Sequence, residues 1–351
     1  MKKKFYMFVM ILIMLLFPSL SFFGNLLAVS VGENQTYASN NNVFYNLKKE
    51  STEVLFLGSS AIGYGVSPIT LWHETGVSSV LRWTGYQNPM IMYYYLLDSL
   101  QYQSPKVVVL DAKTLTFKVN DFNYSLEPYL RSAIDLLPMS EIKKEAIETI
   151  ADLTDNHLYT KLSYYVKFLR YNGNISNLAY VEDLYNYVYG NYRINEYDLG
   201  SASSTNLKSA DYTDIILEDA ISNYDYDKLS YDYFVKTIEY CQKSNIDVLI
   251  VSFPSEDWDT SKHELVKNIS DEYGIDYLDY NVKVNLDRLN LDFSSDFHDT
   301  LHLNVYGKTK LTKDLAHYLA ANYDLSDLRN SDEYAVWNSW YDEFAAKYSL
   351  Q

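Results

Sequence analysis

The sequence predicts an α/β protein: a three-layer, doubly wound parallel sheet with a mostly helical insertion and an N-terminal transmembrane helix. Three observations predict it. Short apolar runs that suit buried parallel strands alternate with segments of helical periodicity. A long tyrosine-rich stretch interrupts this alternation. An uncharged apolar run of about bilayer length lies near the N-terminus.

The apolar runs set the predicted strands. They lie at 54–57, 78–83, 106–111, 246–251 and 275–278. Helical periodicity marks 68–75, 89–103, 230–244 and 259–273. This alternation predicts parallel strands whose carboxyl ends share one edge, where open α/β sheets bind ligands. We assign residues 51–118 and 230–325 to the two parts of this domain.

The insertion covers residues 119–229. Within it the pattern predicts helices at 140–153, 157–171 and 178–189, and loops at 172–177 and 191–212. Its many tyrosines leave two interpretations open. They either form a cap that holds a glycan by stacking and hydroxyl hydrogen bonds, or they pack amphipathic helices.

Residues 1–32 are predicted to be a membrane anchor or a signal. Lys2, Lys3 and Lys4 precede the uncharged run Phe5–Val31. Its length suits a single span, and the lysines predict a cytoplasmic N-terminus with the α/β domain outside the cell. The alternative is a secretory signal that is cleaved to release the protein. Residues 33–50 are predicted to be a polar spacer, and 326–351 a C-terminal amphipathic helix.

Charge and cysteine content exclude some classes. The net charge is −17. Because residues 1–32 hold three lysines and no acid, the remainder carries about −20, which excludes nucleic-acid binding. The single cysteine, Cys241, rules out an internal disulfide. The composition is typical of a bacterial protein, and no phosphate-binding glycine loop occurs, so we expect no cofactor.

Two segments carry residues suited to chemistry. Asp299 and His302 lie three apart in a polar stretch that predicts a loop, and Asn304 can cap the helix that follows. On such a loop the carboxylate can hold the imidazole. Ser60 lies directly after the first predicted strand, in Gly58-Ser59-Ser60-Ala61. Together the three residues predict nucleophilic acyl transfer.

These two segments resemble the first and last blocks of the SGNH (GDSL-type) hydrolase superfamily. The resemblance implies that Ser60 is the nucleophile, His302 the base and Asp299 the residue that orients it. Ser59 replaces the usual Asp of the first block. That replacement is similar to a membrane-anchored branch, which includes teichoic acid D-alanylation proteins and alginate-type O-acetylation proteins.

The resemblance also implies an oxyanion hole built from a Gly and an Asn. The best match follows the second predicted strand, at Gly85-Tyr86-Gln87-Asn88, although the family's Gly-x-Asn pattern is not met as written. Backbone N–H groups of Ser60 and Gly85, together with the amide of Gln87 or Asn88, are the expected donors.

The function implied is that of a serine esterase or O-acyltransferase acting on a cell-surface or secreted polysaccharide. Its partners would be an acylated glycan or acyl donor and a membrane-bound O-acyltransferase. One alternative is a non-catalytic surface protein of this fold that binds glycan or assists the acyltransferase. Another is a metal site at His298, Asp299 and His302, which would need a further ligand; we expect no metal.

Overall fold

The computed structural model describes residues 6, 16, 18–28, 34–119, 127–173, 198–209 and 225–350. The chain divides into two compact units. The helical unit comprises Met1–Ser39 and Leu130–Ile194, and the α/β unit comprises Asn40–Tyr129 and Asn195–Gln351. Each unit is described by itself below.

A five-stranded sheet forms the centre of the α/β unit, with strand order β2-β1-β3-β4-β5 and every pair parallel. The strands are β1 (Val54–Gly58), β2 (Ser79–Trp83), β3 (Val107–Asp111), β4 (Asp247–Ser252) and β5 (Asp276–Asp279). Nearly all residues of β1 to β4 are buried, as expected for a parallel sheet covered on both faces. The predicted α/β class and its five parallel strands are confirmed.

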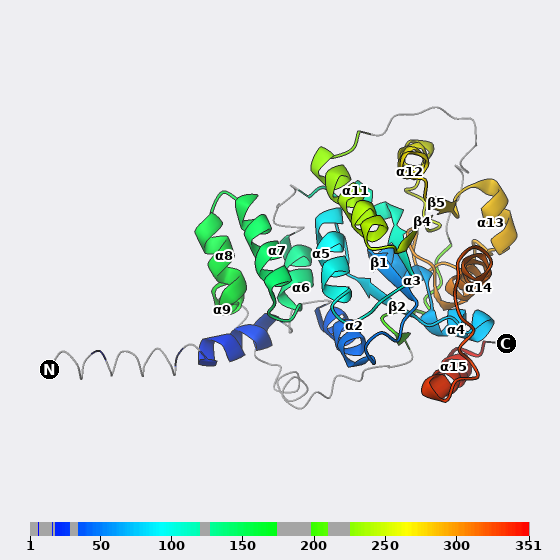
Figure 1. Cartoon of the computed structure of the whole chain (residues 1–351), viewed down its shortest axis with the longest axis horizontal. Helices are drawn as coiled ribbons and strands as arrows, with labels where there is room; N and C mark the ends of the chain where they lie inside the picture. The colour runs from blue at the N-terminus through cyan, green and yellow to red at the C-terminus, as the bar shows by residue number, and fades with distance from the viewer. Residues whose placement is uncertain are drawn as a thin grey trace. The chain divides into compact units, whose positions relative to one another are not determined.

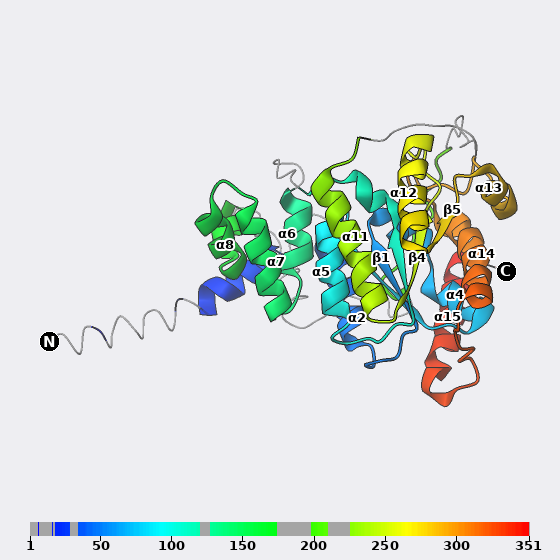
Figure 2. The same cartoon turned by 45° about the horizontal axis from the view of Figure 1, so that its top comes forward.

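Helices cover both faces of this sheet. Figures 1 and 2 show the strands between α5 (Pro89–Ser99) with α11 (Lys228–Lys243) on one side and α4 (Pro68–Thr75) with α14 (Val305–Asn322) on the other. The members of each pair pack against each other. The remaining helices that follow strands are α3 (Ser60–Gly65), α12 (Thr260–Tyr273) and α13 (Lys283–Leu289). Right-handed crossovers between parallel strands produce this three-layer arrangement.

Residues 33–50 were predicted to be a polar spacer, and this prediction is wrong for the residues from Asn40 onward, whose side chains are described. Residues Asn34–Asn46 form helix α2, and from Asn40 onward they belong to the α/β unit. Phe44 is completely buried, and the guanidinium of Arg82 lies 4.1 Å from its ring centroid. The asparagines at 40–42 make this segment look polar in the sequence. The apolar pair Val43-Phe44 that follows them is buried, and it packs the helix against the core.

The insertion was predicted to cover residues 119–229, but the helical unit ends at Ile194 and the chain from Asn195 belongs to the α/β unit. Its described first part forms α6 (Glu127–Asp135), α7 (Glu141–Asp152), α8 (His157–Tyr165) and α9 (Phe168–Tyr171). The helix predicted at 140–153 is confirmed, and the one at 157–171 is broken between α8 and α9. The helix predicted at 178–189, with its four tyrosines, lies outside the described residues.

Residues 198–209 belong to the α/β unit, contrary to the predicted insertion boundary at 229. The backbone N–H of Leu81 donates to Leu199 O at 3.0 Å. The side-chain nitrogen of Lys308 lies within hydrogen-bond distance of Ser201 Oγ, Ala202 O and Ser203 Oγ. This segment has no apolar periodicity, and the buried amino group of Lys308 on α14 holds it in place.

The two ends of the chain also contain helix. Residues 335–348 form α15 (Ala335–Tyr348), which packs on α4 and buries Trp337 and Phe344. Near the N-terminus, residues 18–28 are helical. Within the described ranges, no helix has the length and apolar character required to cross a bilayer. Most of the predicted anchor, 1–32, lies outside those ranges.

Candidate active site

Ser60 lies at the carboxyl edge of the sheet, as the first residue of α3 directly after β1. Ser59 caps this helix, because its extended backbone lets its Oγ accept the N–H of Ala61 at 3.2 Å. Gly58 is required for close packing, since a Cβ there would collide with the side chain of Asp111. Strand β1 thus delivers Ser60 at the edge where parallel sheets bind ligands.

Asp299 and His302 lie on a loop, as their sequence context predicts. An antiparallel bridge between Phe297 and Leu303 closes the loop, and the N–H of Leu301 donates to Asp299 Oδ1 at 2.8 Å. Asn304 ends it by capping α14, where Oδ1 accepts the N–H groups of Tyr306 and Gly307. The short turn from 299 to 302 therefore folds the carboxylate back toward the imidazole.

The structure brings Ser60, His302 and Asp299 into one hydrogen-bonded chain. Ser60 Oγ lies 2.8 Å from His302 Nε2. On the other side of the ring, His302 Nδ1 lies 2.9 Å from each oxygen of Asp299. With the proton on Nδ1, the ring donates to Asp299 and its Nε2 accepts the Ser60 hydroxyl. This is the geometry that a serine nucleophile and its base require.

The surroundings keep His302 neutral and Asp299 ionised. Burial lowers the pKa of His302 below its ordinary value, and the opposing effect of Asp299 is smaller. For Asp299, burial acts to raise the pKa, but the hydrogen bonds from His302 and Leu301 outweigh it, so the pKa is lowered. A neutral imidazole beside a carboxylate is the state in which His302 can accept a proton.

Asp111 supports the Ser59–Ser60 turn from the end of β3. Its completely buried carboxylate accepts the N–H of Ser59 at 2.9 Å and the Ser59 hydroxyl at 2.6 Å. Its other oxygen accepts the N–H of Lys113 at 2.9 Å. Burial raises the pKa of Asp111, against the hydrogen bonds from Ser59. The sequence signal for this role was only a carboxylate at the carboxyl end of a buried strand.

Lys113 places a positive charge beside the site, which sequence analysis missed. Its ammonium donates to Ser255 Oγ at 3.2 Å and to Asp257 Oδ1 at 3.0 Å. The neighbouring Glu256 donates its N–H to Thr300 O, so this loop contacts the Asp299–His302 turn. The Lys113 charge adds to burial in lowering the pKa of His302. No spacing rule links residue 113 to residue 302.

His298 packs beside the triad and is held by its own contacts. Its ring stacks on Tyr64, with centroids 5.3 Å apart, and the same tyrosine ring lies 5.0 Å from that of His302. His298 Nδ1 lies 2.9 Å from Ser204 Oγ, in the segment 198–209. Since both ring nitrogens of His302 contact Ser60 or Asp299, this cluster supports the triad interpretation over the metal alternative.

The predicted oxyanion residues lie between β2 and α5. Asn88 caps α5, because its Oδ1 accepts the N–H of Ile91 at 3.0 Å. Gln87 is almost completely buried, and neither its Oε1 nor its Nε2 has a hydrogen-bond partner in the described part of the chain. A buried amide without partners is costly unless a ligand completes it. The amide of Gln87 is therefore open to a ligand, while Asn88 uses its Oδ1 to cap α5.

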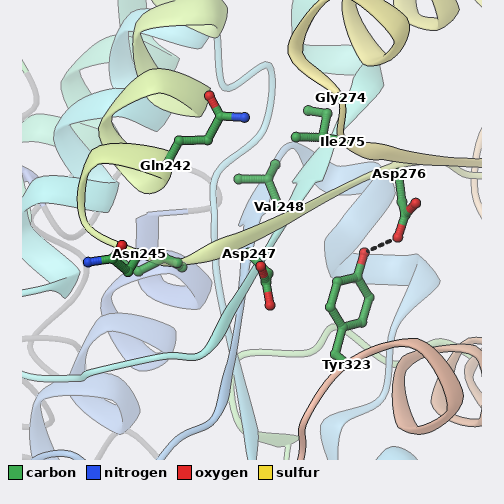
Figure 3. A pocket seen from close by; sticks show the side chains of 9 residues that line it. Gln242, Asn245, Asp247, Val248, Gly274, Ile275, Asp276 and Tyr323 are labelled. Atoms are coloured by element: carbon green, nitrogen blue, oxygen red, sulfur yellow. Dashed lines mark hydrogen bonds between the residues drawn. The ribbon is translucent and has the colours of Figure 1, made fainter.

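A separate pocket of about 470 Å³ opens at the opposite edge of the sheet. Figure 3 shows its polar lining, in which Asp247 and Asp276 begin β4 and β5 and the Tyr323 hydroxyl donates to Asp276 at 2.8 Å. None of the triad residues lines this pocket. It therefore belongs to a different edge from the candidate active site.

The fold and the site together define an α/β protein with a Ser-His-Asp cluster at the carboxyl edge of a parallel sheet. No protein-family model and no curated protein matches the chain. One solved structure similar to it is a "putative acylhydrolase" from Bacteroides fragilis, at 12% identity and a TM-score of 0.37. That alignment covers 80% of this chain and 93% of the other.

Proposed function

We propose that the protein is a serine acyl-transfer enzyme, an esterase or an O-acyltransferase. The observation that carries this proposal is the hydrogen-bonded chain from Ser60 through His302 to Asp299. Its support is chemical: a serine hydroxyl becomes a useful nucleophile when a neutral, oriented imidazole accepts its proton.

The reaction proceeds in two halves. Ser60 Oγ attacks an ester carbonyl while its proton passes to His302 Nε2, and Asp299 stabilises the imidazolium. The tetrahedral intermediate expels the alcohol, which takes the proton from His302 and leaves an acyl group on Ser60. Water or a sugar hydroxyl then attacks the acyl carbonyl, giving its proton to His302, and the second intermediate collapses as Ser60 Oγ leaves and takes that proton from His302. Water yields the free acid, and a sugar hydroxyl yields a new ester.

The oxyanion formed in each half needs donors. The backbone N–H groups of Ser60 and Gly85 and the side-chain amide of Gln87 or Asn88 are the proposed donors. The helix cap uses Asn88 Oδ1 and not its N–H groups, and the buried amide of Gln87 favours Gln87. Each donor of this kind is worth roughly 3 kcal/mol of transition-state stabilisation in other serine enzymes.

A cell-surface or secreted polysaccharide is the proposed substrate. This part rests on the predicted anchor, with the α/β unit outside the cell, and on the acidic charge of −17, which disfavours polyanionic substrates. A membrane-bound O-acyltransferase is the proposed partner that would supply acyl groups from the membrane side. Secretion after signal cleavage is the alternative for the location.

Hydrolysis of a chromogenic acetate ester tests the acyl-transfer proposal. We expect Ser60→Ala to lose at least about 10³-fold in kcat/KM, since removing a triad nucleophile abolishes the covalent route. Ser339→Ala, an exposed serine on α15, is the matched control and should keep full activity. Equal rates for wild type and Ser60→Ala would refute the enzyme and favour the non-catalytic alternative.

Mass spectrometry of an oligosaccharide distinguishes the two enzymes. A gain of one acyl mass from an added donor identifies a transferase, and its loss from an acylated glycan identifies an esterase. Ser60→Ala should abolish whichever change occurs.

A further inference from the structure

The helical unit exposes a group of large apolar side chains that we call the α8–α9 face. Its members are Leu158 (66% exposed), Tyr159 (48%), Leu162 (44%) and Leu169 (39%). Leu158 and Leu162 lie one turn apart on α8, and the Tyr159 hydroxyl donates to Leu169 O at 3.2 Å, which joins α8 to α9. Exposed apolar side chains that gather in one place can mark a protein or membrane interaction surface.

The α8–α9 face adjoins the N-terminal helical residues 18–28. Leu27 and Ala28 are buried in a cluster with Tyr171, and Phe168 packs against it. Gly24 lies directly against α9, since a Cβ there would sit 2.5 Å from Phe168 N. Figure 1 shows this blue helix beside α9. Farther along it, Phe22 and Phe23 are exposed.

Chain length relates this contact to a bilayer. Phe5–Gly24 contains 20 residues and no charge, and three lysines precede it. A helix of that length spans about 30 Å, the thickness of a hydrocarbon core. If the lysines mark the inner boundary, Gly24 falls at the outer one. Phe168, in contact with Gly24, then lies at the same level, together with the rest of α9.

Buried polar contacts hold α6, α8 and α9 together behind the α8–α9 face. Buried Arg131 on α6 donates to Asp135 at 3.0 Å and to Ser163 Oγ of α8 at 2.9 Å, while the Tyr171 hydroxyl of α9 donates to Asp135. On α8, Lys161 pairs with Glu148 of α7. A lipid surface can therefore accept the face without exposing a free ammonium of this helix.

We propose that the α8–α9 face lies in the outer lipid–water interface, so that the helical unit is seated on the bilayer beside the anchor. Leucines would enter the acyl region, and Tyr159 would place its hydroxyl at the headgroups. The proposal rests on the membrane anchor in the proposed function, and it is independent of the triad. Its occupant is lipid because residues 18–28, the described end of an uncharged apolar run, pack against α9 in the same unit.

Depth-dependent quenching in vesicles tests this placement. The full chain is reconstituted into phosphatidylcholine–phosphatidylglycerol vesicles whose acyl chains are brominated. Leu158→Cys and Leu162→Cys carry an environment-sensitive fluorophore. Val284→Cys, at a position 61% exposed in the α/β unit, is the control. Native Cys241 is completely buried, so it does not compete for the label in the folded protein.

We expect labels at 158 and 162 to be quenched at least threefold more than the label at 284, with blue-shifted emission. Equal quenching at all three positions, in protein that resists carbonate extraction, would overturn the lipid contact while leaving the anchor. Release of the chain by carbonate would overturn both. Ester hydrolysis is measured on the same preparations, so failure of the membrane proposal is distinguished from failure of the acyl-transfer proposal.

Discussion

Asp111→Ala removes the carboxylate that supports the nucleophile turn, and its cost follows from the contacts. Three donors lose their acceptor: the N–H and hydroxyl of Ser59 and the N–H of Lys113. A buried donor left unsatisfied costs about 1–3 kcal/mol. Relief from burying a charge offsets part of the sum, so we expect a loss of about 3–5 kcal/mol in the free energy of unfolding.

The same change should reduce activity in the molecules that remain folded. Ser60 begins α3 directly after Ser59, so a shift of the turn moves Oγ relative to His302 Nε2, now 2.8 Å away. A displacement of about 1 Å can cost roughly 100-fold in rate. Asp111→Asn keeps the shape and one acceptor, so it should lose only about 1–3 kcal/mol and recover part of the activity.

Urea unfolding followed by circular dichroism gives the stability, and kcat/KM on a chromogenic ester gives the activity. Asp287→Ala is the control, because Asp287 forms only an exposed i,i+4 pair with Lys283 and should change stability by less than about 0.5 kcal/mol. The reasoning is wrong if Asp111→Ala unfolds within about 1 kcal/mol of wild type and retains wild-type kcat/KM.

Two further predictions concern pH. Lys113→Met should raise the midpoint of the acidic limb of kcat/KM, because the lost charge no longer helps burial to lower the pKa of His302; Lys113→Arg should restore it, and an unmoved midpoint would exclude this coupling. Burial lowers the pKa of Lys308 to about 7, so between that pH and about 10.4 the unfolded chain binds a proton that the folded chain lacks. Stability should therefore rise with pH, by up to about 1.4 kcal/mol per unit, and Lys308→Met should lack this slope. Parallel unfolding free energies for the two proteins at pH 7, 8 and 9 would contradict it.

The sheet could be predicted because each strand has a clear local sequence signal. Val107–Asp111 and Asp247–Ser252 are short runs rich in β-branched residues and bounded by polar residues. Because both faces of these strands are buried, the runs are continuously apolar and do not alternate with polar residues. The Asp299–His302 pair could also be predicted, since only two residues separate its members and a local turn can join them. Local signals thus gave both the strands and half of the candidate site.

The remaining features depend on contacts between distant segments. Helix α2 forms on polar residues because Phe44 finds a buried position near Arg82. The segment 198–209 returns to the α/β unit because Lys308, about a hundred residues later, bonds to its carbonyl and hydroxyl oxygens. Neither Arg82 nor Lys308 lies in the sequence window from which the local structure is predicted. Propensity depends on neighbours along the chain, whereas these contacts join residues that are neighbours only in space.

The nucleophile turn shows how an atypical motif can remain chemically complete. Where the resemblance leads to an Asp, this chain has Ser59, whose hydroxyl and N–H both need a buried acceptor. Asp111 supplies it from β3, and the close approach needs Gly58, where any side chain would collide with that carboxylate. Gly58, Ser59 and Asp111 therefore act as one unit, and exchange of Ser59 alone for Asp would set two carboxylates against each other in a buried space. A sequence motif includes position 59 but not the distant position 111. Comparison with the motif therefore shows only the missing Asp at 59, although Asp111 supplies a carboxylate beside the same turn.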